Sequence, residues 1–276
     1  MRRILTVLFL FAFLFVIPGY GQDHEWEAVK MDGSRTGCIS PSKDNIAEAV
    51  GFFKSGRYVA PNGKVFKRNS AAAKTAKAVL EAQPAMSKVK DVVAYSEQAM
   101  EIVYPEGPLS NWFIDIVMTK TGQLSGKKVD VGVGNFGGIR VDMPKGDVIL
   151  DDLLSMFPFK NQLVYVEHKG SEIRNMLEKM AAGRFQVLGG VRVVVENGAI
   201  VSAEIGGEPI DDERIYGVAT ISFLLNGGDG LFMEKNAVSV TKFDVDIIDA
   251  VLEHVYAETA ADRNIVSKAD GRVIIR

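Results

Sequence analysis

Cysteine is nearly missing from this sequence, since Cys38 is the only one among 276 residues. One cysteine cannot form an intramolecular disulfide, so the fold must be held by burial of apolar side chains. Apolar residues make up 47% of the chain, which is enough for a sizeable core. The length allows one large domain or two small ones.

Histidine is almost as scarce, with only His24, His168 and His254. None lies within four residues of another, and the sequence contains neither a His-Glu-x-x-His motif nor a cysteine cluster. A histidine-based metal site is therefore not expected. We expect each histidine at the surface or at the end of a strand.

Several catalytic and nucleotide-binding signatures are also missing. No Gly-x-Ser-x-Gly motif is present, and the glycine-rich stretch at 226–230 has no lysine after it, which excludes a nucleophile elbow and a Walker loop. "GVGNFGG" (132–138) has the wrong glycine spacing for a dinucleotide fingerprint. The net charge of −3 gives no basic field for nucleic acid or an anionic membrane, so any phosphate recognition must be local.

The N-terminus carries a processing signal. Arg2 and Arg3 precede an apolar run at residues 4–17, which is short for a membrane span of about 20 residues. We interpret residues 1–21 as a signal peptide cleaved near Gly21–Gln22; a retained anchor is the alternative. The mature chain is then expected outside the cytoplasm, periplasmic or extracellular, with no membrane association after cleavage.

The rest of the chain divides into two parts. Residues 22–69 are rich in glycine, proline, serine, lysine and asparagine. They predict either a loop-rich extension with a short helix at 44–54, or a partly disordered linker. Helical and strand patterns alternate from Ser70 to the end, and some strands form hairpin-like pairs, which predicts an α/β (α+β-like) domain of mixed sheets flanked by helices over 70–276.

The individual elements follow from periodicity and caps. Ser70 is a suitable N-cap for a helix that we expect to stop at Pro84, and Gly122 is expected to end a helix that starts near Leu109. Further helices are predicted at 171–182 and 244–260. The predicted strands are 91–95, 127–135, 162–168, 191–198, 200–207, 214–223 and 272–276.

Two motifs place polar and aromatic residues at the ends of apolar strands. In "NFGGIR", Asn135 and Arg140 flank a glycine pair, and a guanidinium beside an exposed turn can bind carboxylate or phosphate. The alternative is a tight turn with a structural Arg–Asp pair. In "FPFKN", Phe157 and Phe159 have the same parity and would share a side in extended chain, with Asn161 beyond. Two core phenylalanines are the simpler interpretation.

A third motif, "FLLNGGDG" at 223–230, closes an apolar run. Its glycines let the backbone approach another group closely, and Asp229 offers two acceptor oxygens. A carboxylate repels phosphate but suits a pair of sugar hydroxyls. An ordinary turn is the alternative.

In this order, the three motifs resemble the C-terminal, substrate-binding domain of the 5′-nucleotidase family. The similarity extends from "PEGPLSNWFID" (105–115) through the three motifs to "GRVII", over roughly residues 90–276. The resemblance implies that Phe159 and Phe223 sandwich a nucleobase, that Asp229 binds the ribose hydroxyls, and that Asn135 and Arg140 contact the nucleoside and phosphate. The substrate-binding residues it implies are Asn135, Gly138, Arg140, Phe159, Asn161, Phe223, Gly228 and Asp229.

Two departures from the family matter. Family enzymes carry a second phosphate-binding arginine shortly before the glutamate of the "PEGPLSN" block, where this sequence has Val103. The family's metallophosphoesterase domain, which holds two metals, is not recognisable here. We therefore expect no catalytic residue, metal or cofactor on this chain, with divalent metals on a partner chain only.

The leading hypothesis is a substrate-recognition domain of a 5′-nucleotidase-like hydrolase system in nucleotide catabolism, inactive alone and completed by a metallophosphoesterase chain. The alternatives are an exported nucleoside- or nucleotide-binding protein without catalysis, and an interaction or structural module on the same fold. Nucleic acid is not an expected partner.

Overall fold

A computed structural model describes residues 45–276 of the chain. The predicted signal peptide, His24 and Cys38 lie outside the described residues. The helices are α2 (Ile46–Ala49), α3 (Ala71–Met86), α4 (Pro108–Ser125), α5 (Leu150–Met156), α6 (Gly170–Ala182), α7 (Ser222–Leu225) and α8 (Ile247–Ala260), with 3-10 turns η2 (Lys88–Lys90), η3 (Phe136–Gly138) and η4 (Gly228–Gly230).

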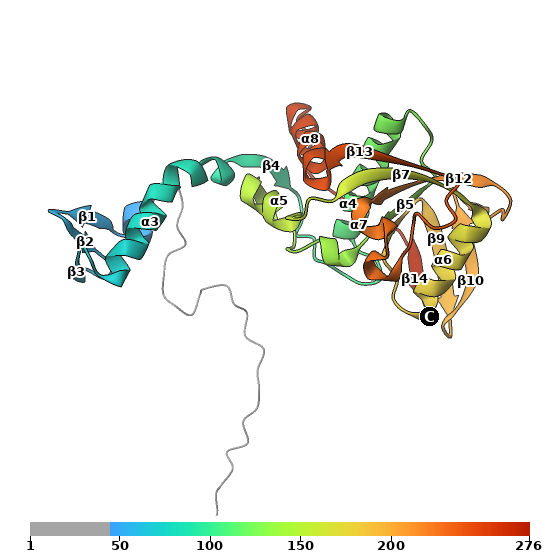
Figure 1. Ribbon diagram of the computed structural model, residues 1–276, viewed down its shortest axis with the longest axis horizontal. Helices are drawn as coiled ribbons and strands as arrows, with labels where there is room; N and C mark the ends of the chain where they lie inside the picture. Colours follow the sequence, from blue (N-terminus) through green and yellow to red (C-terminus); the bar gives the residue numbers. More distant parts are fainter. Residues whose placement is uncertain (1–44) are drawn as a thin grey trace, which may run out of the picture.

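Fourteen strands accompany them in the described chain. They are β1 (Phe52–Lys54), β2 (Arg57–Val59), β3 (Val65–Lys67), β4 (Val92–Ser96), β5 (Val131–Gly134), β6 (Gly146–Ile149), β7 (Gln162–Lys169), β8 (Val187–Gly189), β9 (Val191–Glu196), β10 (Ala199–Ile205), β11 (Glu208–Pro209), β12 (Ile215–Ile221), β13 (Ser239–Asp246) and β14 (Val273–Ile275). The elements from η2 to β14 form the main body, and those from α2 to α3 form a smaller N-terminal unit (Figure 1).

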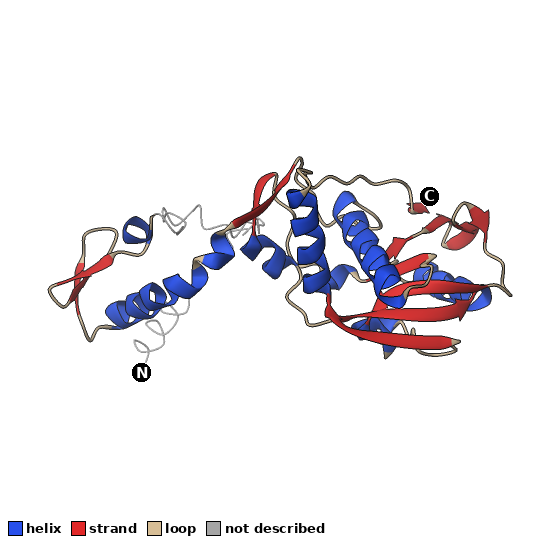
Figure 2. Ribbon diagram, turned by 90° about the horizontal axis from the view of Figure 1, so that it is seen from above, coloured by secondary structure: helices blue, strands red, loops and turns tan. Residues whose placement is uncertain are grey.

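A five-stranded mixed sheet organises the main body, in the order β13-β7-β12-β5-β8. β12 runs parallel to β5 and antiparallel to β7. Helix α4 packs on this sheet and lies next to α8 (Figure 2). Glycines in the strands allow the close approach of α4, because a Cβ on Gly132 would lie 2.7 Å from the side chains of Ile114 and Met118.

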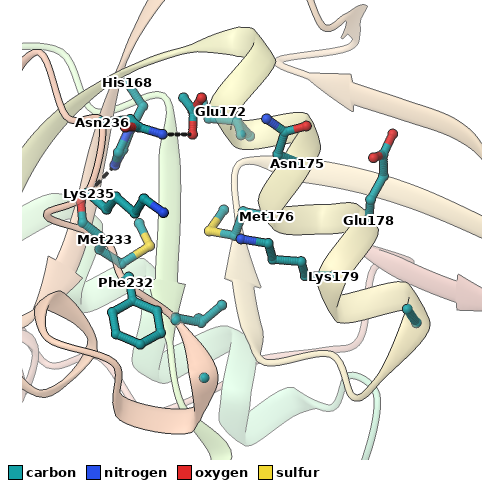
Figure 3. A pocket seen from close by; sticks show the side chains of 14 residues that line it. His168, Glu172, Asn175, Met176, Glu178, Lys179, Phe232, Met233, Lys235 and Asn236 are labelled. Atoms are coloured by element: carbon teal, nitrogen blue, oxygen red, sulfur yellow. Dashed lines mark hydrogen bonds between the residues drawn. The ribbon is translucent and has the colours of Figure 1, made fainter.

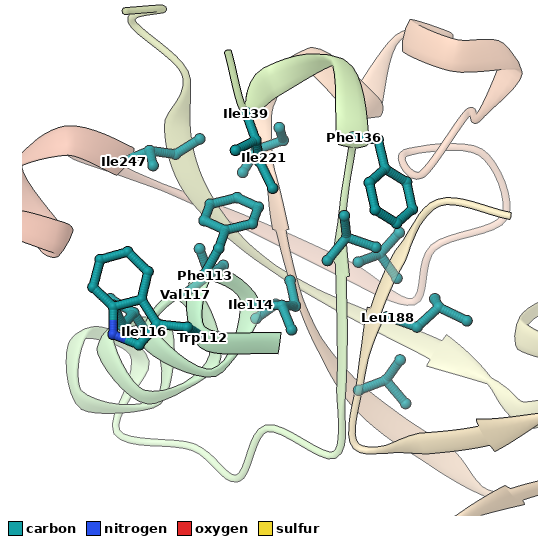
Figure 4. Close-up of a cluster of buried hydrophobic side chains, with 14 of the residues drawn as sticks. Trp112, Phe113, Ile114, Ile116, Val117, Phe136, Ile139, Leu188, Ile221 and Ile247 are labelled. Atoms are coloured by element: carbon teal, nitrogen blue, oxygen red, sulfur yellow. The ribbon is translucent and has the colours of Figure 1, made fainter. Parts of the chain in front are cut away.

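The core of the main body lies between α4 and this sheet. Helix α4 contributes Phe113, Ile114 and Val117, all at most 1% exposed, and Ile221 of β12 is fully buried. Figure 4 shows these side chains together with Ile247 at the start of α8. Phe113 also stacks on Phe157, with ring centroids 5.1 Å apart. This core fixes the positions of the loops at the ends of the strands.

A second sheet, in the order β11-β10-β9-β14, completes the main body together with the β4–β6 ribbon. β9 and β10 form the predicted hairpin, and its turn residues Asn197 and Gly198 both have positive φ, as such a turn requires. Helix α6 contacts both β7 and β10 and so joins the two sheets. The predicted fold class, mixed sheets flanked by helices, is confirmed.

The N-terminal unit consists of the antiparallel sheet β1-β2-β3 and helix α3. Its small core contains Tyr58, Ala73 and Ala76, with Phe66 partly buried beside them. Ser70 caps α3 as predicted, because its Oγ accepts a hydrogen bond from the backbone N–H of Ala73 at 3.2 Å. Figure 1 shows this unit standing away from the main body, with α3 leading toward it.

Several predicted boundaries are wrong. Helix α3 continues through Pro84 to Met86, although Pro84 cannot donate a hydrogen bond to the carbonyl four residues earlier. Helix α4 passes Gly122 and ends at Ser125, where Gly126 caps it in the left-handed conformation (φ 64°). The helix expected at 44–54 covers only 46–49, since Gly51 (φ 87°) turns the chain into β1.

The residues at 239–246 form a strand that the sequence analysis missed. The expected helix at 244–260 begins only at Ile247, and the residues before it belong to β13. β13 lies at the edge of the five-stranded sheet and buries none of its side chains fully. Its sequence therefore lacks the clear apolar alternation that identifies a strand.

Candidate functional site

The three motifs meet at one edge of the five-stranded sheet. β5 ends at Gly134, directly before Asn135, and the parallel β12 ends at Ile221, directly before α7 with Phe223. β7 is antiparallel to β12 and begins at Gln162, just after "FPFKN". The ends of two parallel strands and the start of an antiparallel neighbour lie at the same edge, so this topology gathers the motifs.

Hydrogen bonds fix two of these segments against each other. The backbone N–H of Gln162 donates to Ser222 Oγ at 3.0 Å, and Leu163 pairs with Ile221 in the register of β7 and β12. These contacts set the "FPFKN" segment beside the beginning of "FLLNGGDG". The separation of Phe159 and Phe223 is thus governed by two adjacent strands rather than by free loops.

Asn135 and Asp229 form the polar centre of the site. The Nδ2 of Asn135 donates to Asp229 Oδ2 at 2.9 Å, joining residues 94 positions apart. Asn135 is 5% exposed and its Oδ1 has no partner among the described residues, whereas Asp229 is exposed. Asp229 adopts a left-handed conformation (φ 49°, ψ 29°), which aspartate tolerates better than most residues. The hydrogen bond from Asn135 occupies Oδ2 of Asp229, and the exposed carboxylate remains accessible to a ligand.

Two glycines are required by close packing in this centre. A Cβ on Gly138 would lie 2.6 Å from Asn135 Oδ1, and a Cβ on Gly228 would lie 2.3 Å from the carbonyl oxygen of Phe223. Both separations are shorter than a van der Waals contact allows. Gly138 therefore lets the "NFGGIR" loop fold closely over Asn135, and Gly228 lets the "FLLNGGDG" loop fold closely over Phe223.

Arg140 and Phe159 form a second pair at the site. The Arg140 guanidinium lies 5.8 Å from the centre of the Phe159 ring, and its Nη1 donates to the carbonyl of Gly137 at 3.3 Å. Among residues 45–276 no carboxylate is within ion-pair distance of Arg140. The alternative of a structural Arg–Asp pair is therefore wrong, and the cation is available to an anion.

The aromatic residues divide into buried and exposed ones. Phe157 is 2% exposed and stacks on Phe113, whereas Phe159 is 46% exposed. The expectation that they share a side is wrong, because Phe157 ends α5 and the chain is not yet extended there. Phe223 is 45% exposed between the fully buried Ile221 and Leu224. Burying a phenylalanine is favourable, so two exposed rings at one sheet edge suggest a ligand surface.

Asn161 lies at the start of β7. Its backbone N–H donates to the carbonyl of Phe159 at 2.9 Å, and its own carbonyl accepts from the N–H of Ile247 at 2.9 Å. Both backbone groups are therefore occupied in holding the segment that carries Phe159. The Asn161 side chain is half-buried.

Tyr104 and Arg184 lie beside the site and were not identified from the sequence. The Arg184 guanidinium is 4.9 Å from the centre of the Tyr104 ring, and that ring packs edge-on against Phe136 of "NFGGIR" at 5.9 Å. Tyr104 Oη accepts from the backbone N–H of Phe185 at 3.1 Å. These contacts join segments about 80 residues apart, so no local pattern indicates them.

The "PEGPLSN" block has a structural role. Glu106 accepts hydrogen bonds from Asn111 Nδ2 and from the backbone N–H groups of Asp270, Gly271 and Val273, at 2.8 to 3.3 Å. It thereby anchors the segment that leads into β14. Val103, at the position expected for the family's second arginine, is 43% exposed.

The described histidines are not arranged for metal binding. His168 is 5% exposed at the end of β7, and its Nε2 lies 2.8 Å from the carbonyl of Met233. Burial lowers the pKa of His168, and burial also lowers the pKa of His254. Within residues 45–276, no group of three or more His, Cys, Asp and Glu side chains is placed to hold a metal ion.

A separate cavity of about 620 Å³ lies between α6 and residues 230–236. Figure 3 shows Met176 and Met233 facing each other across it, with Phe232 below. None of the eight predicted site residues lines it. We assign the site to the sheet edge, because the exposed rings, the free cation and the open carboxylate converge there.

No helix of the described residues is both long and apolar enough to cross a membrane. This finding concerns residues 45–276 only.

Comparisons with known proteins agree with these motifs. Residues 84–236 match the family described as "5′-nucleotidase, C-terminal domain". The chain is 34% identical to Protein UshA of Salmonella pullorum over 113 residues, which is 39% of this chain and 20% of that protein. It is 32% identical to a 5′-nucleotidase of Vibrio vulnificus over 134 residues, 46% of this chain and 24% of that protein. The chain thus spans a fifth to a quarter of the curated relatives it matches.

The fold is also found in solved structures. The crystal structure of a 5′-nucleotidase precursor from Thermus thermophilus superposes with a TM-score of 0.63 and 25% identity, covering 77% of this chain and 46% of that one. The family match spans more than half of the chain and contains all three motifs. The chain belongs to the 5′-nucleotidase C-terminal domain family.

Proposed function

We propose that this chain binds the nucleoside part of a nucleotide at the sheet edge and presents its phosphate to a dimetal hydrolase domain on another chain. The observation that carries the proposal is the convergence of two exposed phenylalanines, an open carboxylate and an unpaired arginine at one edge. These are the groups that a nucleotide needs: aromatic faces for the base, an acceptor for the ribose hydroxyls and a cation for the phosphate.

Each group has a definite task in this proposal. Phe159 and Phe223 stack on the base, which is worth about 1–3 kcal/mol per base and tolerates different bases. Asp229, held by Asn135, accepts hydrogen bonds from the ribose hydroxyls. Arg140 binds the phosphate, and its position 5.8 Å from the Phe159 ring centre shows that this cation belongs to the same site as the ring.

The hydrolytic step belongs to the partner in this proposal. Divalent metals on the partner would activate water and polarise the phosphate. This chain contributes substrate orientation, which can supply much of the rate enhancement when the reacting groups are held in place. We place the protein outside the cytoplasm, on the basis of the signal peptide expected at residues 1–21.

Binding can be tested without a partner. Titration calorimetry of the chain with AMP should show saturable binding that Phe159→Ala and Phe223→Ala each weaken by about tenfold or more. Tyr256→Ala is the matched control, because Tyr256 is 47% exposed on α8 and distant in sequence from all three motifs. Equal weakening by all three variants, or no binding of AMP, would contradict the proposed site.

Hydrolysis requires a second experiment. Phosphate release from AMP should appear only when a metallophosphoesterase chain and a divalent metal are added together. Release that is unchanged by adding this chain to the partner would show that it takes no part in the reaction.

A non-catalytic nucleoside-binding protein is the second candidate, and Val103 favours it. The family's second phosphate-binding arginine is replaced by an apolar side chain here, which weakens the hold on phosphate relative to the hold on the nucleoside. In this case adenosine and AMP would bind with similar affinity, and no partner would produce phosphate from AMP.

A further inference from the structure

The sheet of the N-terminal unit has one face covered by α3 and one that no other part of residues 45–276 covers, called the open face below. Tyr58 pairs with Phe53 and Phe66 across the three strands, and Tyr58 packs against Ala73 and Ala76 of α3. Because side chains alternate between the faces of a strand, the residues on either side of these must point the other way. The open face is therefore built from Phe52, Lys54, Arg57, Val59, Val65 and Lys67.

Strand pairing arranges the open face in two rows. Phe52 pairs with Val59, which pairs with Val65, and these three make an apolar row. Lys54, Arg57 and Lys67 pair in the same way and make a basic row. Phe52 is 45% exposed and Val65 57%, and all three basic residues are exposed.

The basic row has no counter-charge in the structure. Among residues 45–276, no carboxylate lies within ion-pair distance of the three basic side chains. The surroundings are also basic: residues 45–90 contain nine lysines and arginines against two glutamates, a net charge of +7. Residues 91–276 contain 18 basic and 28 acidic residues, a net charge of −10.

A row of apolar side chains beside a row of cations matches an anionic surface with an apolar interior. Interfacial membrane-binding segments have this composition, with aromatic and aliphatic side chains reaching below the headgroups and lysine or arginine at the phosphates. The open face is small, because only six side chains project from it. A stable protein–protein interface uses about 20–30 residues on each partner. The size of the face therefore favours a membrane over a protein partner.

We propose that the open face docks the protein on an anionic phospholipid surface. The apolar row enters the headgroup region and the basic row binds lipid phosphates. The main body, with its negative charge, is repelled from the same surface, so the nucleotide site is held toward the solvent. The net charge of the whole chain concealed this asymmetry, and the proposal departs from the expectation of no membrane association only for the N-terminal unit.

The test measures binding to lipid vesicles by co-sedimentation, using the chain from Gln22 onward so that the apolar segment at 4–17 does not contribute. Vesicles of phosphatidylcholine with about one third phosphatidylglycerol should bind the protein, and pure phosphatidylcholine should not. Each basic residue at such a surface contributes about fivefold, so the triple variant Lys54→Gln/Arg57→Gln/Lys67→Gln should bind about a hundredfold more weakly. Raising the salt should weaken wild-type binding.

The matched control removes the same number and kind of positive charges, but from the main body. Lys145→Gln/Arg192→Gln/Lys242→Gln changes two lysines and one arginine, all exposed and without an ion pair in the described structure. It should bind like the wild type or slightly more weakly, because it makes the acidic main body more negative while leaving the open face intact. For the apolar row, Val65→Ser should weaken binding several-fold and Val266→Ser, a 60% exposed residue in the main body, should not. Unchanged hydrogen exchange in β1, β2 and β3 shows that each variant keeps a folded N-terminal unit, and an unchanged urea unfolding transition shows the same for the main body.

Three outcomes would overturn the proposal. The first is no preference for anionic vesicles. The second is equal loss in the two triple variants, which would mean that overall charge and not the open face is responsible. The third is binding of the wild type to polyglutamate without binding to anionic vesicles, which would point to an acidic protein partner instead.

Discussion

The main body and the N-terminal unit differ in how they are held together and in charge. The main body has a continuous core around α4 and the five-stranded sheet, and it is acidic. The N-terminal unit has a core of three buried hydrophobic residues, Tyr58, Ala73 and Ala76, and is strongly basic. The large core can keep exposed side chains in fixed places, whereas the small one leaves a marginally stable module.

The two regions therefore suit different kinds of recognition. In the main body, burial on both sides of Phe223 holds that ring at the surface, and the strand register fixes its distance from Phe159. Such a site can select a small molecule by shape. In the N-terminal unit, the open face carries an apolar row and a basic row. Such a face can bind a lipid surface, which has no defined shape.

Removing a core ring should give the largest effect and should separate the two regions. Phe113→Ala deletes a ring that is 1% exposed and stacked on Phe157, so we expect the free energy of unfolding of the main body to fall by about 3–5 kcal/mol. Urea unfolding followed by the fluorescence of Trp112 on α4 would measure it.

The comparison variant is Tyr58→Ala, in the core of the N-terminal unit. It should leave the Trp112 transition unchanged and instead increase hydrogen exchange in β1, β2 and β3. If Tyr58→Ala lowered the stability of the main body as well, the two regions would not be independent.

Adjacent glycines in "NFGGIR" test how tightly the site is packed. A Cβ on Gly138 would lie 2.6 Å from Asn135 Oδ1, whereas one on Gly137 would lie 3.5 Å from Asn135 Nδ2, an ordinary contact. Gly138→Ala should displace the buried Asn135 side chain and break its hydrogen bond to Asp229. We expect the free energy of unfolding to fall by about 1–3 kcal/mol and AMP binding to be lost.

Gly137→Ala is the control and should keep both properties nearly unchanged. Neither glycine has a positive φ, so the difference between the variants reports packing alone. Equal effects of the two substitutions would show that the Asn135–Asp229 contact is not what orders the site.

Two arginines can be compared to locate the phosphate. Arg140→Gln should weaken AMP binding by about tenfold and leave adenosine binding unchanged, because the lost group is a charge-assisted hydrogen bond to phosphate. Arg184→Gln should affect neither ligand, since Arg184 stacks on Tyr104. Titration calorimetry with both ligands would measure this, and the reverse result would place the phosphate at Arg184.

Local sequence signals gave much of this structure. Ser70 as an N-cap, Gly183 as the end of α6 and the β9–β10 hairpin were all predicted, because caps and tight turns depend on residues a few positions apart. The three motifs were found for a similar reason. Each follows or precedes an apolar strand, and strand ends can be recognised in the sequence.

What the sequence could not give depends on distant contacts. Phe157 and Phe159 differ in exposure because α5 ends at Phe157 and the ring of Phe157 stacks on Phe113. The alternation of side chains along an extended chain does not predict this difference. The edge strand β13 has little apolar alternation, and the pairing of Arg184 with Tyr104 joins remote segments. The charge difference between the two regions was hidden in a whole-chain sum.

Acid should destabilise the main body through His168, which is buried, and His254, which is half-buried. Burial lowers the pKa of His168 and of His254 in the folded state, so below about pH 6.5 the unfolded chain binds protons that the folded chain does not. Stability is therefore fully present above that pH and falls as the pH drops toward the folded-state pKa values. Urea unfolding between about pH 7.5 and 5.5 would show it.

His168→Gln is the informative variant, because it removes one of the two titrating groups. Its free energy of unfolding should change less steeply with pH over that range than that of the wild type. An unchanged slope would mean that His168 does not titrate differently in the two states. Residues 45–90 contain no histidine, so this effect is confined to the main body.

The smallest expected effect is at the cap of α3, and it shows how differently the two regions respond. Ser70→Ala removes the acceptor for the Ala73 N–H and should cost about 1 kcal/mol. Removal of the surface ion pair between α4 and α8 by Lys120→Gln should cost about as little, roughly 0–1 kcal/mol.

In the main body a loss of this size is small beside the stability that the large core provides. In the N-terminal unit the same loss opens a module with few buried contacts, so hydrogen exchange in β1–β3 should rise several-fold in Ser70→Ala. Exchange in β5 and β12 should stay unchanged in both variants, and unchanged exchange in β1–β3 would show that the small unit draws its stability from a source other than its own core and cap.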